Sequence, residues 1–162
     1  MVNEPTGYFT ATLTTAKFIR YFSIGIFIFS LLCPCFDTEK AAGGPGQGGG
    51  LLLQGLFWFM YMSPGFVWLA NPLLLFSWIY LNKKRTRSLI FSVVSFFMAA
   101  CFLFYKDMLT DESGSNSTPI IAHQAGYWLW LVSILIMLFG NLYLKVVGDD
   151  LEKSPAPANP AA

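Results

Sequence analysis

Residues 82–87 form a short basic turn between two long apolar segments: Asn82, Lys83, Lys84, Arg85, Thr86 and Arg87. The turn holds four of the ten Lys and Arg residues of the chain. A basic cluster between hydrophobic segments is typical of a cytoplasmic loop in a membrane protein, because such loops are retained on the cytoplasmic side. We expect the four cations to set the topology, with contact to anionic lipid headgroups as the alternative role.

The composition agrees with a membrane protein. Of the 162 residues, 55% are hydrophobic and 17% aromatic, and only 12% are charged. A soluble domain carries about 25% charged residues, so this chain has too much apolar sequence for a water-soluble core. The net charge is +1, and we do not expect nucleic acid as a partner.

Outward from the turn, the apolar segments predict four membrane-spanning helices at about 17–36, 66–81, 89–105 and 126–145. The predicted fold class is therefore an all-α integral membrane protein, a bundle of four transmembrane helices with flexible tails. The membrane domain comprises residues 17–146. A polar cytoplasmic segment, 1–16, precedes it, and a tail rich in Pro and Ala, 147–162, is predicted to be disordered and cytoplasmic.

The apolar segment before the basic turn is too long for one span. As a straight helix, residues 51–81 would be about 46 Å long, against a hydrocarbon core of about 30 Å. Pro64 and Gly65 predict a break, so 51–62 becomes a short interfacial or re-entrant helix. Asn71 and Pro72 predict a second break, where the amide either satisfies the freed backbone or forms part of a binding site.

The charge distribution predicts which side each loop faces. The outer side holds a Gly-rich flexible linker, 37–50, and a polar loop, 106–124. The only Lys and Arg residues in these two segments are Lys40 and Lys106. The other eight Lys and Arg residues lie on the inner side. This asymmetry predicts cytoplasmic N- and C-termini, and we expect the plasma (inner) membrane as the location.

Small residues form two candidate helix-packing faces. In the third span they recur at steps of four, three and four: Ser88, Ser92, Ser95 and Ala99. In the fourth span they recur at steps of seven: Gly126, Ser133 and Gly140. Small residues allow close approach of membrane helices, so one face is expected to pack inside the bundle and the other to be available to a partner.

Three cysteines lie near the outer ends of the first and third spans: Cys33, Cys35 and Cys101. Thiols in such places usually act as small hydrophobic residues. A disulfide between Cys101 and either Cys33 or Cys35 is one alternative, and a copper(I) site that also uses nearby Met side chains is another. Sequence alone does not decide the connectivity.

No catalytic or cofactor-binding constellation is recognisable. No ionisable residue lies in the interior of a predicted span, and His123 lies in an outer loop without a partner in sequence. We expect no enzymatic activity and no cofactor. The predicted function is helix-helix association, as an accessory or assembly subunit or a homo-oligomer, with the lipid bilayer and another membrane protein or itself as partners. The alternative is a small channel, carrier or copper(I)-handling protein.

Overall fold

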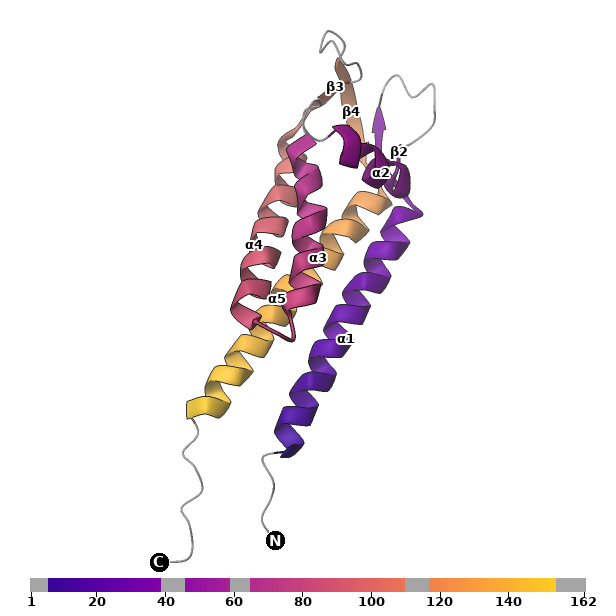
Figure 1. Ribbon diagram of the computed structural model, residues 1–162. Helices are drawn as coiled ribbons and strands as arrows, with labels where there is room; N and C mark the ends of the chain where they lie inside the picture. The colour runs from indigo at the N-terminus through magenta and orange to yellow at the C-terminus, as the bar shows by residue number, and fades with distance from the viewer. Residues whose placement is uncertain (1–5, 39–45, 59–64, 110–116, 154–162) are drawn as a thin grey trace, which may run out of the picture.

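The computed structural model describes residues 6–38, 46–58, 65–109 and 117–153. These residues are mostly helical (Figure 1). The elements in chain order are α1 (Thr6–Leu31), β1 (Pro34–Thr38), β2 (Gly46–Gln47), α2 (Gly48–Trp58), the 3-10 turn η1 (Gly65–Leu69), α3 (Ala70–Tyr80), α4 (Arg85–Cys101), the 3-10 turn η2 (Phe102–Phe104), β3 (Asp107–Leu109), β4 (Ser117–His123) and α5 (Ala125–Lys153).

Three helices are long and apolar enough to cross a membrane. Their qualifying segments are Thr12–Leu31, Arg85–Phe104 and Ala125–Gly148. The segment Gly65–Tyr80, formed by η1 and α3, is apolar but shorter. We call the end of the molecule that carries the strands the outer end, and the end with the α3–α4 turn the inner end (Figure 1).

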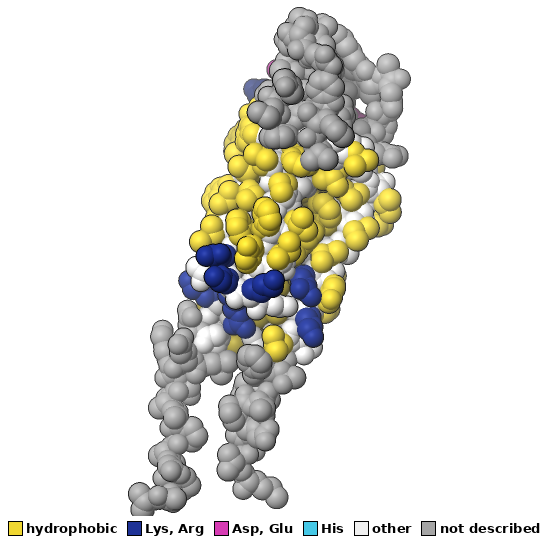
Figure 2. Space-filling model, in the orientation of Figure 1, with side chains coloured by type: hydrophobic (Ala, Val, Ile, Leu, Met, Phe, Trp, Pro, Cys, Tyr) yellow, Lys and Arg dark blue, Asp and Glu magenta, His cyan; other side chains and the backbone are white. Residues whose placement is uncertain are grey.

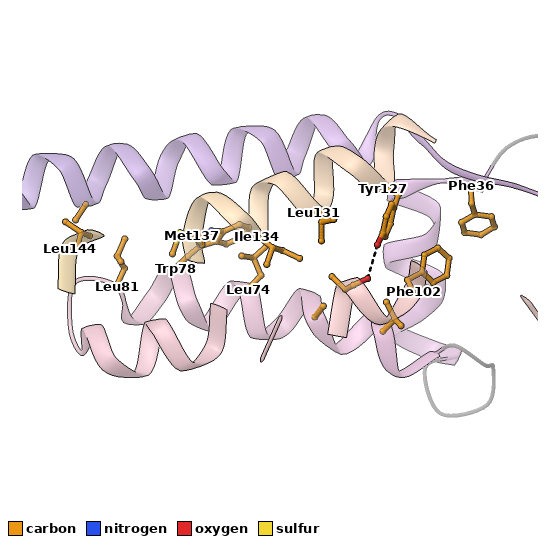
Figure 3. Packing of buried hydrophobic residues seen from close by; sticks show 14 residues of the cluster. Phe36, Leu74, Trp78, Leu81, Phe102, Tyr127, Leu131, Ile134, Met137 and Leu144 are labelled. Carbon is orange, nitrogen blue, oxygen red and sulfur yellow. Dashed lines mark hydrogen bonds between the residues drawn. The ribbon is translucent and has the colours of Figure 1, made fainter. Parts of the chain in front are cut away.

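The long helices pack in the order α1, α5, α4, α3. α1 lies along α5, α5 along α4, and α4 along α3 (Figure 1). Buried apolar side chains follow the bundle from Leu144 near the inner end to Phe36 near the outer end (Figure 3). α3 and α1 have little direct packing, and Trp78 joins them through contacts with Ser23 and Phe27.

Four strands at the outer end correct the all-α prediction. The strands form one antiparallel sheet in the order β2-β1-β4-β3. Phe36 pairs with His123 and Asp37 with Ala122. The segments predicted as a flexible linker and an outer loop therefore contain ordered backbone. Sequence reasoning missed the sheet because its central pair, β1 and β4, joins residues far apart in the chain, so no hairpin signal is visible.

The helix ends also differ from the prediction. α1 begins at Thr6, inside the expected flexible N-terminal tail, and α5 continues through residues 147–153, inside the segment predicted to be disordered. α1 ends at Leu31, before the predicted end of the first span, because Pro34 starts β1. Proline disfavours a helical conformation in the residue before it, which explains the early end.

The short helix of the 51–81 segment is α2, and it lies at the outer end near η1 (Figure 1). It covers 48–58, whereas 59–62 of the predicted helix and Pro64 lie outside the described residues. Gly65 begins η1. The indole N–H of Trp68 donates to the Leu52 carbonyl at 2.8 Å, and the Trp68 ring lies where a side chain on Gly55 would be. These contacts hold α2 against η1.

Candidate functional site

The small-residue face of α4 is fully buried. Its members are Ser88, Ser92, Ser95 and Ala99. The Ser95 hydroxyl donates to the Ala70 carbonyl of α3 at 2.8 Å, and the Tyr127 hydroxyl of α5 donates to the Ala99 carbonyl at 3.1 Å (Figure 3). This face therefore packs against α3 and α5 of the same chain.

The small-residue face of α5 is directed at α1 and the start of β1. The Ser23 hydroxyl of α1 donates to the Ser133 carbonyl at 2.8 Å. A Cβ atom on Gly140 would overlap the Ile19 side chain, and one on Gly126 would lie 2.7 Å from the carbonyl oxygen of Cys33. Both small-residue faces are thus used within one chain, and neither is left for a partner.

A buried polar layer joins α3, α4 and α5. Ser77 and Ser88 exchange hydrogen bonds, because each hydroxyl donates to the other residue's carbonyl, at 3.0 and 2.7 Å. The Asn141 amide donates to the Met137 carbonyl at 2.8 Å and lies 3.4 Å from the hydroxyls of Ser77 and Ser92. Such bonds stabilise contacts between membrane helices.

The polar layer keeps one hydrogen-bond acceptor that is not used within the described part of the chain. The Ser92 hydroxyl donates to the Leu89 carbonyl, so the three serine protons are all given to backbone oxygens. Asn141 Oδ1 is buried and receives no hydrogen bond in the described part of the chain. The layer contains no ionisable side chain, and it therefore offers neither an acid nor a base.

Asn71 and Pro72, where the sequence predicts a break, lie in the first turn of α3, and the change from 3-10 to α-helix comes just before them, at Ala70. The first turn of a helix tolerates proline. Pro72 has no N–H to donate to the Trp68 carbonyl. The Asn71 side-chain amide donates to this carbonyl at 3.0 Å. Of the two roles considered for Asn71 and Pro72, the structure shows the amide bonded to the freed backbone.

An outer ring cluster connects the sheet to the helices. We define it as Phe36 (β1), Phe102 (η2), His123 (β4), Tyr127 and Trp128 (α5). The His123 ring centroid lies 5.3, 4.9 and 6.5 Å from those of Phe102, Tyr127 and Trp128. Phe36 lies 5.9 Å from Phe102. Among the described residues, His123 Nε2 has no hydrogen-bond partner, so its surroundings are those of a packing residue. Sequence reasoning missed this cluster because the sheet assembles it.

The three cysteines are free thiols in the structure. Neither alternative disulfide of Cys101, to Cys33 or to Cys35, is formed. No three His, Cys, Asp or Glu side chains of the described residues are grouped to hold a metal ion. The Cys35 sulfur lies against the backbone of Gly48 and Gly126. Burial, and secondly the neighbouring Cys33 thiol, raise the pKa of Cys35 to about 11.

Seven cations form a basic belt at the inner end. Figure 2 shows Lys and Arg side chains gathered in one band below the apolar surface. The belt comprises Lys17, Arg20, Lys83, Lys84, Arg85, Arg87 and Lys145. Arg85 also donates to the Leu144 carbonyl of α5 at 3.2 Å. The four cations of the basic turn are therefore joined by three cations from α1 and α5.

No protein-family model, curated protein or solved structure matches the chain. Functional inference therefore depends on the geometry of the outer ring cluster, the polar layer and the basic belt.

The raised pKa of Cys35 predicts a pH-dependent reactivity. In a variant with Cys33→Ser and Cys101→Ser, Cys35 is expected to react with iodoacetamide at pH 8 more slowly than in the denatured chain, by up to about 100-fold, because only the thiolate is nucleophilic and burial, the larger cause of the raised pKa, is retained. The rate should rise up to about pH 11. The neutral thiol stabilises the fold below pH 9, and this stabilisation is lost as the pH rises from 9 to about 11. A native rate equal to the denatured rate at pH 8 would contradict the burial of Cys35.

Proposed function

We propose that the chain is an integral membrane protein that crosses the bilayer four times and acts by association, as an accessory or assembly subunit or as a homo-oligomer. The three membrane-length helices support membrane integration, and η1 with α3 is proposed as the fourth span. The basic belt at the inner end favours cytoplasmic termini in a plasma (inner) membrane, because basic residues are retained in the cytoplasm.

The observation that carries the association role is the firm attachment of the outer sheet to the bundle. The outer ring cluster packs β1 and β4 on η2 and α5, and the Tyr127 hydroxyl extends this contact to α4. A sheet held this way presents a defined surface beyond the helices. The buried side chains between the helices are uncharged: most are apolar, and the polar ones are serines and Asn141.

The outer end is also where a partner has apolar surface to contact. Ile121 of β4 is 66% exposed, and Phe104 of η2 is 83% exposed. β3 lies at one edge of the sheet, with the backbone groups of one side unpaired within the described residues. Exposed strand edges are ready to pair with another strand. We therefore assign the contact surface to the outer end instead of the small-residue faces.

Site-specific photo-crosslinking in native membranes tests this proposal. A photoreactive phenylalanine at Ile121 or Phe104 is expected to form a specific adduct, either with a foreign membrane protein or with a second copy. The matched control is the same probe at Phe139 of α5, which is 63% exposed on an apolar helix face. Mild extraction and mass determination of the intact complex then give its composition. A monomer without adducts at either outer position would refute the association role.

A further inference from the structure

No ion pair between the seven belt cations and a carboxylate is found among the side chains that the structure describes, which exclude those of Asp149, Asp150 and Glu152 at the end of α5. Arg20 donates weakly to the Tyr21 hydroxyl, at 3.3 Å, and its guanidinium lies 4.9 Å from the Tyr21 ring centroid. A group of positive side chains at one level attracts anions.

The belt has one place where two helices meet without packing closely. α1 packs on α5, and α3 packs on α4, so the seam between α1 and α3 is joined through Trp78. The indole N–H of Trp78 donates to the Ser23 hydroxyl at 3.0 Å, and the Trp78 ring lies 5.5 Å from that of Phe27. Trp78 therefore joins α1 to α3 across this seam.

One cation of α1 and one cation of the α3–α4 turn lie on the inner side of Trp78. Arg20 precedes Ser23 by three residues, about 4.5 Å along the axis of α1. Lys83 lies in the turn that follows α3, three residues after the end of that helix at Tyr80. Residues seven apart on a helix differ by about 20°, so Arg20 lies on the same face of α1 as Phe27, the face that contacts α3.

We propose that an anionic phospholipid binds at this seam, with its headgroup phosphate held by Arg20 and Lys83. Guanidinium groups bind phosphate oxygens in bidentate fashion, and a lysine ammonium adds a second positive charge. Exposed apolar side chains of α1 and α3, among them Tyr21 and Ile79, offer surface to the acyl chains. Basic pockets between membrane helices bind anionic headgroups for these reasons.

This inference rests on the proposed membrane integration, and it is independent of the association role. Extraction of membranes at alkaline pH tests integration separately, because a peripheral protein is released and an integral one is retained. A retained protein without lipid binding would refute only the lipid site.

The test is native mass spectrometry of the full-length chain, titrated with phosphatidylglycerol or with phosphatidylcholine as the neutral control. The variant Arg20→Gln/Lys83→Gln is compared with Arg87→Gln/Lys145→Gln, which removes the same charge from the belt at exposed positions on α4 and α5. The first variant is expected to lose about 25-fold in affinity for phosphatidylglycerol, since each direct hydrogen bond to the phosphate contributes about five-fold. The second variant keeps both direct contacts, so it is expected to lose less than five-fold.

Three outcomes would overturn the site. Equal losses in both variants would show diffuse attraction to the whole belt. Equal binding of phosphatidylcholine and phosphatidylglycerol would remove the role of the headgroup charge. Full displacement of the lipid by millimolar inorganic phosphate would indicate a site for a free anion. Unfolding midpoints of both variants are measured alongside, so that loss of binding is not confused with loss of fold.

Discussion

Trp78→Ala is expected to lower the free energy of unfolding by about 4 kcal/mol, the range seen when a buried tryptophan is removed from a packed core. Trp78 is only 8% exposed, and its ring fills the junction of α1 and α3. The substitution removes the edge-to-face contact with Phe27 and the hydrogen bond to Ser23. Ser23 keeps its bond to Ser133, so α1 should remain on α5 and separate from α3.

Trp78→Phe separates the contribution of the indole N–H from that of the ring, and Phe139→Ala is the control. Trp78→Phe keeps an aromatic ring and loses the N–H, so it is expected to cost about 1 kcal/mol, the usual net value of one hydrogen bond. Phe139→Ala removes an exposed ring from α5 and should change the unfolding midpoint little. Unfolding in detergent, followed by tryptophan fluorescence, gives the free energies. Spin labels on α1 and α3 give the distance between the helices, which should increase only in Trp78→Ala.

Gly126→Val is expected to destabilise the outer end of the bundle by about 3 kcal/mol, the upper part of the range for overpacked sites. A Cβ at this position would lie 2.7 Å from the carbonyl oxygens of both Cys33 and Pro34, and 3.0 Å from the Cys35 sulfur. Two of these neighbours are backbone atoms in the connection between α1 and β1. They cannot rotate away, so α5 must move outward and the sheet must move with it.

Gly25→Val is the matched control for this prediction. Gly25 lies in α1, and nothing lies within 4 Å of a Cβ built on it. Both variants add a valine side chain to a membrane-length helix, but only the side chain of Gly126→Val meets backbone oxygens. Unfolding midpoints in detergent are expected to fall for Gly126→Val and to remain near the native value for Gly25→Val. Equal midpoints would show that α5 does not approach the α1–β1 connection as closely as described.

The residue pattern predicted the parts of the fold that depend on local periodicity. The steps from Ser88 to Ala99 defined one helix face, and in the structure that face lies against α3 and α5. The consequence of Pro72 for the preceding backbone also followed from local chemistry. Such features can be predicted from the sequence because the residues that determine them lie within one or two helical turns of each other.

The remaining features depend on contacts between distant residues. Gly126 and Gly140 were recognised as small, but nothing local indicated that Cys33 and Ile19 would approach them. The outer ring cluster needs β1 beside β4, and these strands are short and flanked by polar sequence. Their pairing depends on the bundle bringing their ends together, and sequence periodicity carries no such information.

The strand order β2-β1-β4-β3 has a consequence for biosynthesis. The Gln124 side chain bonds to Asp37, 87 residues earlier, next to the β1–β4 pairing. The chain is made from the N-terminus, so β1 emerges with one edge unpaired while α3 and α4 are still being synthesised. The sheet closes only after β4 has been made. Until then the unpaired edge of β1 is open to pairing with another strand, so an incomplete chain exposes a site for aggregation or chaperone binding that the finished chain has covered.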